Sequence, residues 1–128
     1  MLTASKPVEG FLDFLREARA AYNIARSEES DANDATQDLL HSLELEEHRY
    51  HDCARLSSAL RDVRRQRRAA KDAVQRLHPL VEWMDRNNRT IKEMERLLGD
   101  IRKAEASTEN RHYNHKTDIV QQVIGGQR

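Results

Sequence analysis

Six cationic side chains stand within residues 61–71, and no other stretch of the sequence is so well suited to binding chemistry. Five of them are arginines, whose planar guanidinium groups bind phosphates and carboxylates through two parallel hydrogen bonds. Each phosphate that such a group neutralises releases counterions and adds salt-dependent affinity. We therefore expect binding residues on one exposed helix surface, namely Arg61, Arg64, Arg65, Arg68 and Lys71.

This basic cluster fits two kinds of partner. One is a nucleic acid or a nucleotide, and the other is the surface of a partner protein. The formal net charge of the chain is 0, and no aromatic residue stands among the arginines to stack on bases, so both observations oppose nucleic acid. A third interpretation is a solvated helix face that pairs with acids such as Glu44, Glu46 and Glu47.

Charge is sorted along the chain although its sum is zero. Residues 27–52 hold nine acids against one arginine, a net charge of −8. Residues 61–76 hold seven bases against two acids, a net charge of +5. Blocks of opposite sign can steer self-association or the approach of a charged partner.

A second group of chemically capable residues precedes the basic cluster. His41, Glu44 and His48 share one helical face, with Asp52 one turn further and His51 beside it. Imidazole and carboxylate groups ligate transition metals. This face lies opposite the apolar residues of the same helix, so a closed metal site would need ligands from another helix or subunit. We therefore interpret it as a solvated acidic face, and expect neither a metal nor a cofactor.

The sequence contains no motif that indicates an enzyme. It has no glycine-rich loop of phosphate-binding spacing, and Cys53, its single cysteine, has no neighbouring motif that would activate the thiol. We expect Cys53 to be a small residue in a helix seam. The chain is therefore predicted to be non-enzymatic.

Composition predicts an all-α protein. Hydrophobic residues make up 38% of the 128 residues and charged residues 34%, with only four glycines and two prolines. One helical domain over residues 1–106 is expected, followed by a C-terminal segment, 107–128. No apolar run approaches the roughly 20 residues that span a bilayer, and no secretory signal is recognisable, so we expect a cytoplasmic protein.

Apolar periodicity predicts where the helices lie. A first amphipathic helix begins at Pro7 and ends in the polar stretch 27–33, and a second begins near Asp34. The second helix carries a regular seam with the a/d spacing of a coiled coil. Its members are Cys53, Leu56, Leu60, Val63, Arg67, Ala70, Val74, Leu77, Val81 and Met84, with Leu39, Leu40, Leu43 and Tyr50 extending it N-terminally.

Two residues of the second helix depart from this pattern. Arg67 is the one cation in the seam, where its guanidinium either reaches out to water or pairs with an acid. Pro79 removes a backbone donor, so we expect a kink or a short break beside it.

Asn87–Asn88 should end the second helix, and the Thr90–Glu93 capping box should begin a third, which folds back on the second as an antiparallel hairpin. Gly99 lies within the third helix, where close helix packing is the simplest explanation for it. Residues 118–124 then form a short helix or strand. Arg111, His112 and Tyr113 stand in a polar stretch without helical periodicity, and we expect them to contact a partner.

Five segments together resemble a group of small helical proteins encoded by phages and prophages of Gram-positive bacteria. They are Thr36–Leu45, Arg61–Asp72, Pro79–Met84, Arg96–Lys103 and Glu109–Tyr113. The resemblance covers roughly residues 34–113 and carries no established activity. It implies a context, because small accessory phage proteins commonly bind and block a host component, often one of antiviral defence.

We therefore expect a phage-type binding protein that inhibits or sequesters a host factor, with nucleic-acid or nucleotide binding as the alternative. The fold is expected to be an N-terminal helix plus a long, coiled-coil-like antiparallel hairpin. A short N-terminal helix cannot cover both arms of such a hairpin, so a second copy of the chain is expected to complete the core.

Overall fold

The computed structural model describes residues 1–109 and 115–125, and all regular structure in them is helical. In chain order the helices are α1 (Ser5–Leu45), α2 (Tyr50–Arg86), α3 (Asn88–Glu109) and α4 (Ile119–Gly125). The predicted all-α class is confirmed. No helix in the described part of the chain is long and apolar enough to cross a membrane.

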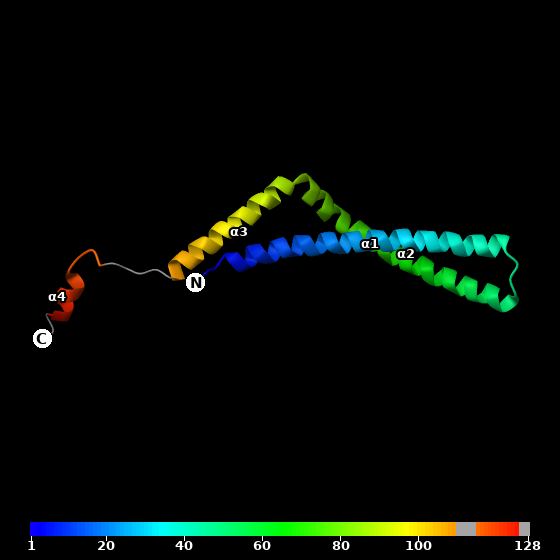
Figure 1. The fold of residues 1–128 in the computed structure, drawn as a ribbon, viewed down its shortest axis with the longest axis horizontal. Coiled ribbons are helices and arrows are strands. Elements are labelled where there is room, and N and C mark those ends of the chain that lie inside the picture. The colour runs from blue at the N-terminus through cyan, green and yellow to red at the C-terminus, as the bar shows by residue number, and fades with distance from the viewer. Residues whose placement is uncertain (110–114, 126–128) are drawn as a thin grey trace.

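The long helices α1 and α2 run antiparallel and pack along each other as a hairpin (Figure 1). Its arms differ from the predicted ones, which were the second and third helices. Beyond the crossing, α2 turns into α3, which returns toward the N-terminus of α1. α3 packs mainly on α1 and only slightly on α2. Among the described residues, α4 packs against none of the other helices.

The prediction that the first helix ends in residues 27–33 is wrong, because α1 continues through them to Leu45. Serine, asparagine and aspartate cost only a few tenths of a kcal/mol each in a helix interior, and no glycine or proline interrupts this stretch. The buried stripe also continues across it through Ala25, Ala32 and Thr36. Packing against α2 therefore outweighs the weak local preference for a break.

The chain reverses instead at residues 46–49, where one continuous helix was expected. Glu46 adopts an extended backbone, and α1 has no basic residue in its last turn while acids crowd its negative end. In the tautomer with its proton on Nε2, His48 donates a hydrogen bond to the carbonyl of Ser42, 3.0 Å away, and so caps α1. Tyr50 is 85% exposed and does not extend the seam.

The predicted seam of α2 is confirmed, since each of its ten positions from Cys53 to Met84 is buried or half-buried. α1 covers this seam, because it is 41 residues long instead of ending near Ser27. A second copy of the chain is therefore not needed to cover the seam. α2 also continues through Pro79 without a break.

The core changes character along α1. Near its N-terminus, where three helices meet, the buried side chains are large, and Leu12 and Leu15 are almost completely enclosed. Further along, where only α2 is opposite, the buried residues are small, including Ala25, Ala32 and Ala70. Thr36 satisfies its buried hydroxyl by donating to the carbonyl of Ala32 at 2.7 Å. Small side chains let two helices approach closely without a third layer.

α3 begins at Asn88, two residues before the predicted capping box, so Thr90 already lies inside the helix. Asn87 precedes α3 and accepts its first helical hydrogen bond, which the amide of Ile91 donates to the Asn87 carbonyl at 3.0 Å. The predicted stop at Asn87–Asn88 is confirmed. The third helix was expected to pack back along the second, and this prediction is wrong, because α3 packs mainly on α1.

Close packing does not explain Gly99, since a Cβ atom there would meet no heavy atom within 4 Å. We therefore expect Gly99→Ala to stabilise the protein by about 1 kcal/mol, because alanine restricts the unfolded chain and favours the helix. Thermal unfolding followed by circular dichroism measures this change. Ala104→Gly, at an exposed site of the same helix, should shift the midpoint in the opposite direction. A lower midpoint for Gly99→Ala would contradict the open space at this site.

Leu98 and Leu97 provide a matched test of how α3 is seated. Leu98 is 7% exposed and faces the core, whereas Leu97 is 49% exposed. Truncating the first to alanine should cost about 2–5 kcal/mol through lost burial and the cavity left behind. Truncating the second should cost well under half of that. Urea unfolding curves of the two variants measure these losses. Equal decreases in the two midpoints would contradict the orientation of α3.

Candidate binding surface

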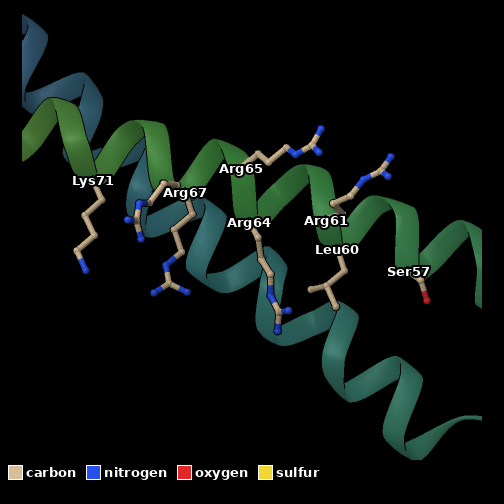
Figure 2. A pocket seen from close by; sticks show the side chains of 8 residues that line it. Ser57, Leu60, Arg61, Arg64, Arg65, Arg67 and Lys71 are labelled. Carbon is tan, nitrogen blue, oxygen red and sulfur yellow. The ribbon is translucent and has the colours of Figure 1, made fainter.

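The basic cluster lies in the middle of α2, and helical spacing divides it into two rows. Arg61, Arg65 and Arg68 follow each other at spacings of four and three residues, which places them on one helical face. We call them the outer arginines. Arg64, Arg67 and Lys71 form the second row, and in Figure 2 their side chains leave α2 on the side opposite to Arg61 and Arg65.

A depression of about 540 Å³ lies between these side chains. Every residue around it belongs to α2, so its walls are long side chains of one helix and no second element closes it. It is a surface of closely spaced cations and not an enclosed pocket. The residues around it are Ser57, Leu60, Arg61, Arg64, Arg65, Arg67, Arg68 and Lys71.

The acids of the chain leave this surface almost unpaired. Only two contacts involve it, Arg61 Nε to Asp62 at 3.9 Å and Arg68 Nε to Asp72 at 4.0 Å, and both partners are on α2 itself. Such long, exposed pairs contribute little to stability. Within the described residues, Arg64, Arg65, Arg67 and Lys71 have no carboxylate within 4.0 Å.

The predicted pairing of the cluster with Glu44, Glu46 and Glu47 is therefore wrong, because none of these acids forms an ion pair with it. Glu46 instead accepts a hydrogen bond from the Ser42 hydroxyl at 2.9 Å and lies 3.5 Å from His48 Nε2. The acidic and basic blocks lie on neighbouring helices, yet their side chains do not meet. The positive charge of α2 remains available to a partner.

Ion pairs between helices form at the other end of the molecule. Arg19 meets Asp85 of α2 at 2.6 Å, and Arg16 meets Glu95 of α3 at 3.6 Å. Arg102 of α3 reaches back to Glu9 at 3.1 Å. These pairs link the helices at the three-helix end, so among the described residues the ion pairs between helices and the basic cluster are separate in space.

The candidate metal face does not form. The chain reversal at residues 46–49 separates His41 and Glu44 on α1 from His51 and Asp52 on α2. No group of three or more histidine, cysteine or acidic residues in the described part of the chain could hold a metal ion. Cys53 is half-buried at the first seam position, with its Sγ 3.9 Å from the carbonyl of His48.

The remaining predicted binding residues, Arg111, His112 and Tyr113, lie outside the described residues. The described segment that follows them contains a feature that the sequence analysis did not single out. α4 exposes four apolar side chains at spacings that put them on one face, and they are Ile119, Val120, Val123 and Ile124. Their spacing is the signal that could have found them.

Comparisons with known proteins identify no relative, since no family model, curated protein or solved structure matches the chain.

Proposed function

We propose that this chain is a non-enzymatic binding protein that docks the outer arginines of α2 on an acidic surface of a host protein. One observation carries the proposal. Arg61, Arg65 and Arg68 stay exposed and almost unpaired although residues 27–45 of the neighbouring helix hold six acids and no lysine or arginine. Charges that serve only stability would meet those acids, as Arg16 and Arg19 meet theirs.

The geometry of α2 suits such docking. The first and last outer arginines are seven residues apart in the helix, which is about 10 Å at 1.5 Å per residue. The helix is packed along α1, so the three cations keep a defined spacing before they meet a partner. Like charges on a packed helix raise the rate of association with an acidic protein surface and disfavour association with a basic one.

The resemblance to small phage proteins supports a host factor of antiviral defence as the partner, which the chain would inhibit or sequester in the host cytoplasm. The resemblance concerns sequence alone, and Arg61–Asp72 is one of its segments. The alternative is binding of a nucleic acid or a nucleotide through the same cluster. The two proposals differ in how strongly affinity depends on salt.

The triple change Arg61, Arg65 and Arg68 to alanine tests the proposal. Capture of the partner from a lysate of a Gram-positive host, read by mass spectrometry, should be lost. Helicity and the melting temperature should stay nearly unchanged, because exposed charges contribute little to stability. The matched control changes Lys92, Arg96 and Lys103 on α3, which are equally exposed, and should leave capture intact.

Retained capture by the triple variant would refute the docking role of the outer arginines. Salt titration of the captured complex separates the two partner classes. A steep log-linear loss of affinity with salt concentration indicates nucleic acid, since several counterions are released, whereas a shallow loss indicates a protein surface.

We also propose that copies of the chain associate, now through the outer face of α1. Phe14 and Ile24 are 50% and 59% exposed, and they flank Ala21 at heptad-like spacing on that face. Light scattering should give a mass above the 14.9 kDa of one chain. Changing both residues to serine should restore a single chain, while Leu45→Ser, at the 80% exposed end of α1, should not. A single-chain mass for the unaltered protein would refute self-association.

A further inference from the structure

A cleft of about 530 Å³ lies along one side of the contact between α1 and α2, beside Arg64 and Arg67 of the second row of cations. Unlike the depression among the arginines, it is built by two helices. Six of its residues belong to α1 and two to α2. They are Asn33, Thr36, Gln37, Leu40, His41, Glu44, Arg64 and Arg67.

Arg67 is the unusual member of this cleft. It holds a seam position and is half-buried between the helices, yet no described carboxylate lies within 4.0 Å of its guanidinium. Because no acid of the described chain pairs with this guanidinium, an anion that enters the cleft can bind to it. Arg64 stands one turn away and lines the same cleft. Two guanidinium groups at this spacing can hold the oxygens of one phosphate from two directions.

The α1 side of the cleft supplies further polar groups. The side chains of Asn33, Gln37 and His41 form no hydrogen bond with any other described residue. In contrast, the Thr36 hydroxyl already donates a hydrogen bond to the carbonyl of Ala32. The cleft therefore contains amide and imidazole groups that are able to bond to a ligand, in addition to the two guanidinium groups.

Glu44 narrows the class of ligand. It is the one acid lining the cleft, and its carboxylate repels a purely anionic ligand while accepting hydrogen bonds from hydroxyl or amino groups. A ligand that suits the whole cleft has a phosphate at one end and hydrogen-bond donors at the other. The volume also lies within the roughly 300–1,000 Å³ typical of small-molecule sites.

From these observations we infer that the cleft between α1 and α2 binds a nucleoside phosphate, with Arg64 and Arg67 on the phosphate and Glu44 on the nucleoside. The site goes beyond the proposed protein docking, because the outer arginines take no part in it. In Figure 2, Arg61 and Arg65 point away from the side on which Arg64 and Arg67 lie. Those two residues therefore serve as matched controls on the same helix.

Calorimetric titration of the full chain with AMP, GMP, CMP and UMP tests the inference, with the four nucleosides and inorganic phosphate in parallel. At least one monophosphate should bind with a Kd below about 1 mM, whereas the nucleosides and phosphate alone should bind at least tenfold more weakly. Arg67→Ala and Arg64→Ala should each weaken binding tenfold or more, which is about 1.4 kcal/mol. Arg61→Ala and Arg65→Ala should stay within twofold.

Arg67→Lys guards against a trivial loss of structure, because it keeps the charge but not the planar fork, and should weaken binding with unchanged helicity. The inference is overturned if none of the four monophosphates binds. It is also overturned if a nucleoside binds as tightly as its phosphate, or if the Arg61 control loses as much as the Arg67 variant. Tight binding of a single-stranded oligonucleotide that depends equally on all five arginines would assign the surface to nucleic acid instead.

Discussion

The structure depends on one contact, the packing of an uninterrupted α1 along the seam of α2. Alanines on both helices make this contact close over the middle of the pair, and leucines from α1 close the wider space where α3 joins. α1 provides most of the surface against which both other long helices pack. Its continuity through a polar stretch is therefore the condition for the arrangement of the whole described domain.

That contact also decides what the charges can do. The acids of α1 and the cations of α2 lie on neighbouring helices, but among the described residues no ion pair joins them, and Arg67 in the seam has no carboxylate within 4.0 Å. Ion pairs between helices form only where Arg16, Arg19 and Arg102 reach across the three-helix end, among the described residues. The cations in the middle of α2 therefore take almost no part in holding the helices together.

The two rows of cations have different surroundings. The outer arginines stand in solvent and can recognise only a large surface that comes to them. Arg64 and Arg67 stand beside amide, imidazole and carboxylate groups of α1, so they can contribute to a cleft that surrounds a small ligand.

The sequence by itself determined the helical class, the ten seam positions, the stop at Asn87–Asn88 and the position of the basic cluster. Each of these follows from periodicity or from residues with strong local preferences. Tertiary structure alone decided that α1 passes through residues 27–33, that the chain reverses at residues 46–49, and that α1 covers the seam. The physical reason is that local preferences in these stretches amount to tenths of a kcal/mol, whereas a stripe such as Ala25, Ala32 and Thr36 gains burial along its whole length. The spacing of Arg64 and Arg67 was likewise visible in the sequence, but only packing against α1 put Gln37, His41 and Glu44 beside them.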